Sequence, residues 1–218
     1  MQFRLHPNES RPQNRSYTTF MHDRLAPDVR GLEAEAYQQN GYFTVRQARA
    51  HGVSSELLRH HVRQGRFERI RRGLYRVRGF PTAANDDMRE KWMAVGSDDA
   101  VLSHESALAI LDLSDNIPDV VHLLVPRRKR GLRKPAAVVI HTRPDDEQVA
   151  IVWREGLPVT APARTIIDVL GELQPEQAQM AVTQALQRGL VTENQLRAEA
   201  SRKGRQHLLN SVLFGVSA

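Results

Sequence analysis

Between residues 27 and 52 the apolar residues recur at the spacing of short helices. Val29, Leu32 and Ala36 share one helical face and predict a first helix. Thr44 and Gln47 have the spacing of a capping box, which predicts that a second short helix begins between them. The chain therefore starts its folded part with two helices.

A third helix is expected after Ser54, an N-cap residue, and before Gly65, a residue type that often follows a helix C-terminus. Leu58 and Val62 lie four residues apart and would both face the core. In residues 66–79, RFERIRRGLYRVRG, apolar and polar residues alternate as they do in strands. They predict a hairpin with a tight, glycine-containing turn.

Beyond residue 80 the pattern predicts further helices and strands. Ser103 is expected to cap a helix, and Pro162 is expected in a first helical turn, where its missing N–H costs nothing. Thr192 and Gln195 have the spacing of another capping box. The predicted helices cover 86–94, 104–113, 161–170, a region after 174 and the segment 205–216, and the predicted strands cover 120–126, 136–142 and 149–153.

Three short helices followed by a two-stranded hairpin are the order of a winged helix-turn-helix. The predicted fold class is α+β, with an N-terminal winged helix-turn-helix followed by a mixed α/β domain that has a small sheet and C-terminal helices. The expected divisions are a flexible polar tail over 1–24, the winged helix-turn-helix over 25–80 and the α+β domain over 81–218.

The length of 218 residues suits one large or two modest domains, and the chain contains no cysteine. Disulfides, thiolate metal sites and a cysteine nucleophile are therefore excluded. The N-terminal residues lack the apolar stretch of a signal peptide, and no segment reaches the roughly 18 apolar residues of a membrane span. We expect a cytoplasmic protein with no membrane contact.

Basic residues are concentrated in one part of the chain. Residues 31–80 hold ten arginines and no lysine against four glutamates and no aspartate, so this segment alone carries a net charge of +6. The guanidinium group is a planar five-donor fork that suits phosphate oxygens and guanine edges. Because like charges placed so close repel one another, we expect an anionic partner, in the first place nucleic acid.

In a winged helix-turn-helix the third helix enters the major groove and the wing follows the DNA backbone. The stripe of the third helix opposite its apolar pair carries Ser55, Arg59 and Arg63, with His60 beside them. The predicted contacts with double-stranded DNA are Arg46, Ser54, Ser55, Arg59, His60, Arg63, Arg66, Arg69, Arg71 and Arg72.

A second basic cluster, RRKRGLRKP at 127–135, lies between two predicted strands. It is either a solvated hairpin loop or a second contact with nucleic acid or an acidic partner surface. In the helix predicted at 161–170, Arg164 and Asp168 lie four apart and are expected to pair on the helix surface. The candidate contact residues of the cluster are Arg127, Arg128, Lys129, Arg130, Arg133 and Lys134.

Three stretches carry a resemblance to one family. The first resembles the N-terminal winged helix of AbiEi-type antitoxins of prokaryotic type IV toxin–antitoxin systems; it covers residues 41–77, GYFTVRQARAHGVSSELLRHHVRQGRFERIRRGLYRV. The other two are similar to later parts of that family: VLSHESALAILDL at 101–113 and VTAPARTIIDVL at 159–170. The resemblance implies an antitoxin that represses its own operon and counters a nucleotidyltransferase toxin. We expect inverted repeats in its own promoter, bound by two copies of the chain.

Two other classes of function stay open: a metal-dependent enzyme acting on nucleic acid, and a module that docks a protein or RNA without binding DNA. The chain has no Glu-x-Lys segment, glycine-rich phosphate loop or nucleophile elbow. His60 and His61 are adjacent on a helix, so their rings point in different directions and do not share a metal. We therefore expect no catalytic residues, no metal and no cofactor.

Overall fold

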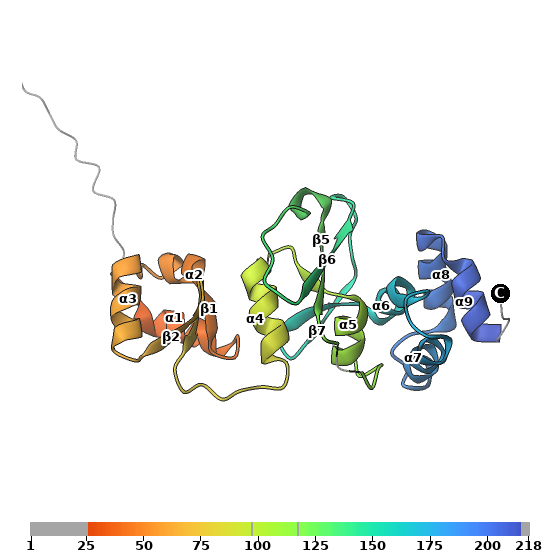
Figure 1. Cartoon of the computed structure of the whole chain (residues 1–218), viewed down its shortest axis with the longest axis horizontal. Coiled ribbons are helices and arrows are strands. Elements are labelled where there is room, and N and C mark those ends of the chain that lie inside the picture. Colours follow the sequence, from red (N-terminus) through yellow and green to blue (C-terminus); the bar gives the residue numbers. More distant parts are fainter. Residues whose placement is uncertain (1–25, 97, 117, 215–218) are drawn as a thin grey trace, which may run out of the picture.

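The computed structural model describes residues 26–96, 98–116 and 118–214. The predicted tail over residues 1–24 lies outside these ranges. The fold is α+β, as predicted (Figure 1). A small unit of helices and a three-stranded sheet stands at one end, a five-stranded mixed sheet lies in the middle, and the helices of residues 175–214 form the other end. None of the helices in the described ranges is long and apolar enough to cross a membrane.

The N-terminal unit follows the predicted element order with one added strand. Thr44 and Gln47 form the expected capping box, and the Ser54 hydroxyl accepts a hydrogen bond from the Leu57 amide at 3.2 Å. The added strand pairs with the second hairpin strand, which gives the sheet order β1-β3-β2. The elements are α1 (Val29–Tyr37), β1 (Tyr42–Thr44), α2 (Val45–Ala50), α3 (Ser55–Arg63), β2 (Phe67–Arg71) and β3 (Leu74–Val77).

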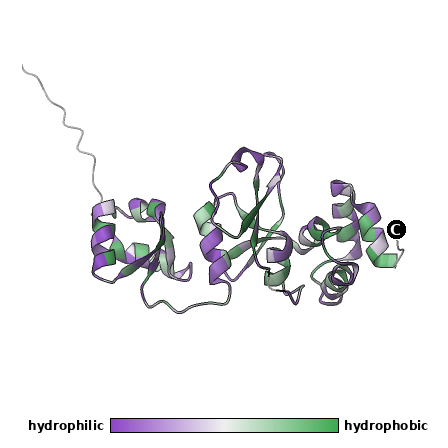
Figure 2. Ribbon diagram, viewed as in Figure 1, coloured by the Kyte–Doolittle hydropathy of each residue, from purple (hydrophilic) through white to green (hydrophobic). Residues whose placement is uncertain are grey.

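An aromatic core fixes α3 against this small sheet. The ring of Phe43 packs edge-on against Phe67 at 4.8 Å and stacks on Tyr75 at 5.8 Å between centroids. Leu58 of α3 is buried in the same core, and Val62 packs against it. Because these apolar residues face inward, the other side of α3 faces solvent, and its ribbon carries both hydrophobic and hydrophilic segments (Figure 2).

The larger sheet has the order β6-β5-β4-β8-β7. Strand β4 pairs with β5 antiparallel and with β8 parallel, and β5 pairs with β6 parallel. The basic segment 127–135 therefore connects two parallel strands and is not the hairpin loop that was one of its two interpretations. The elements are α4 (Asp86–Val95), β4 (Val101–Leu102), α5 (His104–Ile110), β5 (Val121–Pro126), the 3-10 turn η1 (Arg127–Lys129), β6 (Val138–Arg143), β7 (Ile151–Arg154) and β8 (Leu157–Thr160).

The C-terminal helices share one apolar core with the sheet. Ile166 and Ile167 of the first helix, Ala181 of the second and Leu196 of the third are all buried in the cluster that contains the strands β4, β5 and β8. Thr192 and Gln195 form the expected capping box. The helices are α6 (Pro162–Val169), α7 (Pro175–Gln187), α8 (Glu193–Lys203) and α9 (Gln206–Phe214).

Arg76 is the buried arginine of the hairpin. It is 8% exposed, because β3 is the middle strand of its sheet and α4 covers it. Its Nη2 donates to Asp86 Oδ2 at 2.7 Å, and its guanidinium lies 4.7 Å from the centroid of the Tyr42 ring. This buried ion pair ties the N-terminal unit to the start of α4.

Candidate nucleic-acid interface

The solvent face of α3 carries four of the residues expected to contact DNA. Ser55, Arg59, His60 and Arg63 are all exposed, and the helix is anchored behind them by the buried Leu58. Side chains of this length on an exposed, well-packed helix are placed as base-reading residues are in helix-turn-helix proteins. The helix thus presents donors to solvent from a rigid support.

The wing adds two arginines beside α3. Arg69 in the middle of β2 and Arg72 in the turn between β2 and β3 are both exposed, and no carboxylate of the described residues lies within ion-pair distance of either. Gly73 turns the hairpin with a φ of +85°, a conformation that glycine adopts at little cost. The wing therefore carries two guanidinium groups without a carboxylate partner in the described ranges, one of them at its tip, where phosphate contacts are expected.

Four of the predicted contact residues instead hold carboxylates of the protein itself. Two of these pairs lie within the N-terminal unit, and two reach across to the segment that follows it. The pairs are Arg59 with Glu56, Arg66 with Glu33, Arg46 with Asp98 and Arg71 with Glu90.

The ion pairs differ in their hydrogen bonds and in their exposure to solvent. Arg66 grips Glu33 with two hydrogen bonds of 2.6 and 2.7 Å, and the bond from Arg66 lowers the pKa of Glu33. Arg46 and Asp98 are 70% and 54% exposed, and exposed pairs of this kind stabilise a fold weakly. A phosphate group could therefore replace Asp98 more easily than Glu33.

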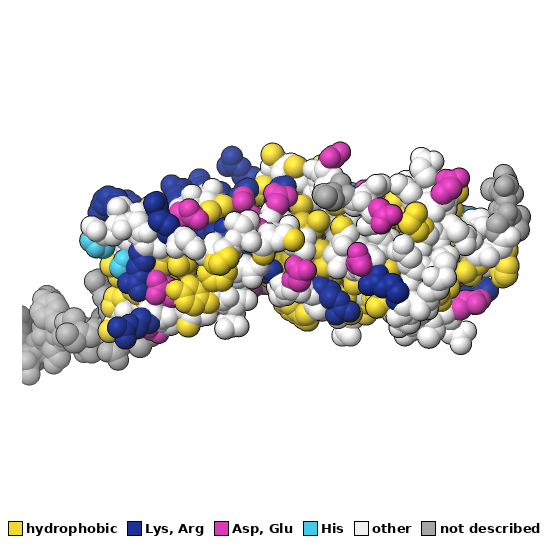
Figure 3. Space-filling view, turned by 90° about the horizontal axis from the view of Figure 1, so that it is seen from below, with side chains coloured by type: hydrophobic (Ala, Val, Ile, Leu, Met, Phe, Trp, Pro, Cys, Tyr) yellow, Lys and Arg dark blue, Asp and Glu magenta, His cyan; other side chains and the backbone are white. Residues whose placement is uncertain are grey.

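Three exposed arginines of the N-terminal unit lie outside the predicted set and also have no ion-pair partner among the described residues. Arg30 lies in α1, Arg49 lies in the last turn of α2, and Arg78 directly follows β3. Lys and Arg side chains gather at this end of the molecule and along one edge, with carboxylates between them (Figure 3). The arginines and predicted contact residues of this unit that are exposed and have no ion pair within the described ranges are Arg30, Arg49, Ser55, His60, Arg63, Arg69, Arg72 and Arg78.

The second basic cluster, residues 127–135, also contains both residues that form ion pairs and residues that do not. Arg128 and Lys129 lie 3.0 and 2.5 Å from the carboxylate of Asp99. The backbone amide of Arg128 also donates to Asp145 at 2.9 Å. The exposed members with no ion pair in the described part of the chain are Arg127, Arg130, Arg133 and Lys134.

Comparison with known proteins decides the family. Residues 32–78 match the family described as "Transcriptional regulator, AbiEi antitoxin", and residues 99–210 match the family described as "AbiEi antitoxin C-terminal domain". The chain belongs to the AbiEi antitoxins. Its role is thus that of an antitoxin and transcriptional regulator of a toxin–antitoxin system.

Two further comparisons concern individual proteins. The AbiEi antitoxin is similar to the RV2827C protein from Mycobacterium tuberculosis, for which a crystal structure is known. The alignment covers 87% of this chain and 81% of the RV2827C chain, with 13% sequence identity and a TM-score of 0.40. No curated protein sequence matches the chain.

Three aspartates that stand next to another aspartate in the sequence form ion pairs in this AbiEi antitoxin. Asp86 contacts Arg76, Asp98 contacts Arg46, and Asp99 contacts the second basic cluster. Asp86 lies in the first turn of α4, whereas Asp98 and Asp99 are adjacent residues between α4 and β4, and the three carboxylates contact different arginines or lysines.

The ion pair expected on the surface of α6 is buried. Arg164 and Asp168 are 5% and 6% exposed, and Arg164 Nε lies 2.5 Å from Asp168 Oδ2. Burial raises the pKa of Asp168, although Arg164 acts against that rise. The helix-spacing rule predicted the pair correctly, but it could not predict that α8 covers it.

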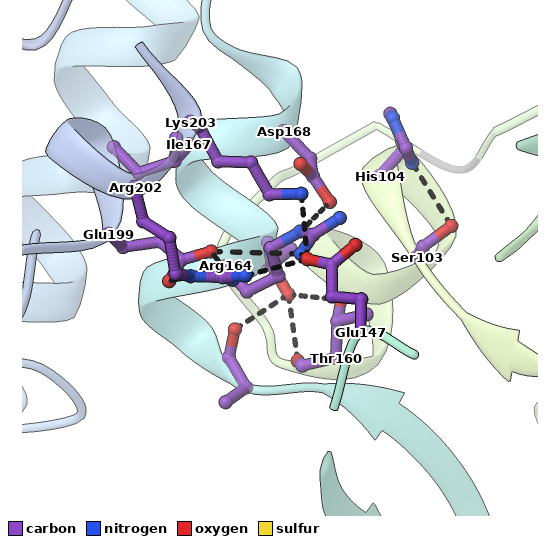
Figure 4. A network of polar contacts seen from close by, with 12 residues as sticks. Ser103, His104, Glu147, Thr160, Arg164, Ile167, Asp168, Glu199, Arg202 and Lys203 are labelled. Atoms are coloured by element: carbon purple, nitrogen blue, oxygen red, sulfur yellow. Dashed lines mark hydrogen bonds and ion pairs between the residues drawn. The ribbon is translucent and has the colours of Figure 1, made fainter. Parts of the chain in front are cut away.

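Glu147 joins this pair to α8. Its Oε1 accepts hydrogen bonds from Arg164 and Arg202 at 2.6 Å and from Lys203 at 2.8 Å, and Figure 4 shows these side chains converging on it. Burial raises the pKa of Glu147, but the hydrogen bonds from Lys203, Arg202 and Arg164 outweigh it and hold the pKa at about 2. The network fastens the segment after β6 to α6 and α8.

The helix α5 begins with a feature that sequence reasoning missed. Ser103 occupies the N-cap position as expected, but its hydroxyl contacts the Nδ1 of His104 at 3.0 Å and makes no capping bond to the backbone. The ring of His104 stacks on that of His141, with 3.4 Å between centroids, and His122 lies beside both. No local spacing signals this cluster, because the three histidines are far apart in the sequence.

Proposed function

We propose that this AbiEi antitoxin binds double-stranded DNA at its own promoter and represses its operon. The observation that supports the proposal is the outward face of α3, where Ser55, His60 and Arg63 are exposed and have no carboxylate partner among the described residues. In such folds this face lies in the major groove. The exposed Arg69 and Arg72 of the wing extend the same basic surface toward the DNA backbone.

The proposed contacts fall into three groups. Ser55, Arg63 and His60, with Arg59 beside them, would face base edges, and Arg49, Arg69, Arg72 and Arg78 would face phosphates. Arg46 and Arg71 would reach DNA only after leaving Asp98 and Glu90. Arg66 and the side chain of Ser54 hold the unit together, since one binds Glu33 and the other caps α3.

The rest of the proposal concerns organisation and partners. The DNA-binding domain would cover residues 25–80 and the antitoxin domain residues 81–218, with two copies bound to inverted repeats. The second domain would counter a nucleotidyltransferase toxin, as the resemblance to AbiEi antitoxins implies. The unpaired residues of the second basic cluster, Arg127, Arg130, Arg133 and Lys134, are the candidate surface for an added phosphate or an acidic partner.

The test is a fluorescence-anisotropy titration of the purified chain with DNA from upstream of its operon, over a series of salt concentrations. With about six phosphate contacts, the affinity should fall on the order of a thousandfold between 50 and 200 mM salt. Arg63→Ala should weaken binding by about 1–3 kcal/mol and relax base preference, whereas Arg72→Ala should weaken binding to all sequences alike.

Arg154→Ala is the matched control, because Arg154 is an exposed arginine on β7, far along the chain from α3. Its affinity for the operator should equal that of the wild type. Weak binding without salt dependence or sequence preference would refute DNA binding. An equal loss of affinity in Arg63→Ala and Arg154→Ala would refute the assignment to α3.

A further function in nucleic-acid chemistry or partner docking has separate tests. Incubation with labelled DNA and RNA in magnesium or manganese should leave both intact if the chain is a regulator. Co-purification with the product of the neighbouring gene, after nuclease treatment, would show a protein contact that does not depend on DNA.

A further inference from the structure

Three histidines from separate elements meet at one face of the larger sheet. His104 begins α5, His122 lies on β5 and His141 lies on β6. One ring nitrogen from each lies within 4.8 Å of the others. The neighbouring parallel strands bring two of them together, since His141 pairs with Leu124, two residues beyond His122 on the same face.

We propose that His104, His122 and His141 form a binding site for a divalent metal ion of the zinc class. Imidazole nitrogen suits Zn²⁺, and three protein ligands leave one tetrahedral position for water. With Zn–N bonds of about 2.0–2.1 Å, ligating nitrogens at tetrahedral angles lie roughly 3.3–3.4 Å apart. The present spacing is thus within about 1.5 Å of a complete site.

Hydrogen bonds around the cluster leave ring nitrogens available for a metal. The Ser103 hydroxyl holds the Nδ1 of His104, which directs the other ring nitrogen, Nε2, away from that contact. Zinc-bound histidines commonly have their second nitrogen held by such a neighbour. The hydroxyl of Ser106, which accepts from the backbone amide of His122 at 2.9 Å, fixes α5 to β5 and with it the position of His104.

The backbone of His104 supports the same conclusion. Its φ is +51°, a left-handed conformation that residues with a side chain adopt infrequently because it brings Cβ close to the backbone. Strain of this kind persists where the surrounding structure enforces it, and it is frequent at functional sites. Here the strained residue is the one that turns its ring over the two strand histidines.

Metal binding requires the rings to move by a small amount. In the structure His122 Nδ1 and His141 Nε2 share a hydrogen bond of 2.9 Å, and the three ring planes are within 13–26° of parallel. A metal must lie in the plane of each ring, so binding requires rotation about χ2, a torsion with broad minima in histidine. His122 and His141 are only half-buried, which leaves a path from solvent.

The charges facing the site come from several elements. Arg164 and Arg205 lie near enough to His104 to lower its pKa, after the larger effects of burial and of the other two histidines. Glu105, which adjoins His104, acts in the opposite direction on His122. Burial lowers the pKa of both His104 and His141.

The test uses the full chain, purified with a tag that lacks histidine and treated with a chelator. Titration with Co²⁺ should yield one ion per chain and the intense visible absorption of tetrahedral cobalt, and added Zn²⁺ should abolish that absorption. Because the chain contains no cysteine, thiolate ligands cannot produce this spectrum. Zn²⁺ should also raise the melting temperature, since it binds the folded state.

Variants assign the site. His122→Ala and His141→Ala should each weaken Zn²⁺ binding at least tenfold, and His207→Ala should not, because His207 is an exposed residue of α9 outside the cluster. Equal binding in all three variants would mean adventitious surface binding and overturn the proposal. The wild-type cobalt spectrum needs no variant to fold: a weak spectrum typical of octahedral cobalt, or no binding, refutes the site.

Discussion

Replacing Glu147 by glutamine tests whether the buried network stabilises the second half of the protein. The substitution keeps the size of the side chain and removes its charge. Glu147 is the residue on which Arg164, Arg202 and Lys203 converge, and its side chain is 10% exposed. In the variant, Arg164 would keep Asp168 and the more distant Glu199, at 3.8 Å, but would lose the carboxylate that its Nη1 contacts at 2.6 Å.

The expected loss of stability follows from the pKa. The pKa of Glu147 is lowered from 4.5 to about 2, and one unit corresponds to about 1.4 kcal/mol, so the charged form contributes about 3 kcal/mol to the free energy of unfolding. The loss of one partner from a buried ion pair costs about 3–5 kcal/mol in other proteins. We therefore expect Glu147→Gln to lower the free energy of unfolding by about 3 kcal/mol at pH 7.

The pH dependence has a defined sign. Because the folded state holds the pKa of Glu147 below its unfolded value, its contribution is complete above about pH 5 and is lost as the pH falls from 4.5 toward 2. The difference between the wild type and Glu147→Gln should shrink over the same range. A network that acts only through packing would leave the difference unchanged.

Urea unfolding followed by tryptophan fluorescence measures this directly. The two tryptophans of the chain, Trp92 and Trp153, lie on α4 and β7, so their signal follows the half that contains Glu147. Glu176→Gln is the control, because Glu176 is an exposed glutamate in the first turn of α7, and it should cost no more than about 0.5 kcal/mol. A loss below 0.5 kcal/mol in Glu147→Gln would refute the reasoning.

Three further substitutions test the N-terminal unit and its contacts. Arg76→Ala should lower the free energy of unfolding by about 3–5 kcal/mol in urea titrations, since it leaves Asp86 buried without its partner, and a loss under 1 kcal/mol would contradict the burial of the pair. Thr44→Ala removes the capping box of α2 and should cost about 1 kcal/mol by the same measurement; an unchanged value would contradict it. Asp98→Asn removes the carboxylate that pairs with Arg46 and should increase the affinity for the operator severalfold at low salt, and by less at high salt. Anisotropy titrations measure this change, and a lower affinity would argue against a phosphate contact by Arg46.

Local rules predicted the helices well because their signals act within a few residues. The capping boxes at Thr44 and Thr192 and the N-cap at Ser54 each join a side chain to an amide three residues away. The winged-helix order followed from these starts and from the alternation after residue 66. Such signals do not depend on the rest of the fold.

The sequence analysis did not predict strands that depend on pairing with distant segments of the chain. β4 is two residues long, Val101–Leu102, and it is a strand because β5 and β8 pair with it on both sides. β8 contains Pro158, a residue that argues against a strand when the sequence is read alone. Pairing between distant segments has no signature at a fixed local spacing.

The sequence by itself determined that this chain has a basic helix-turn-helix order and an arginine-rich wing, because charge and periodicity are properties of neighbouring residues. Only the tertiary structure decided which arginines stay unpaired: Arg46 finds Asp98 at a separation of 52 residues, whereas Arg63 finds no carboxylate among the described residues. It also brought together His104, His122 and His141. Electrostatic and coordination energies depend on distance in space, and packing alone sets that distance for groups so far apart along the chain.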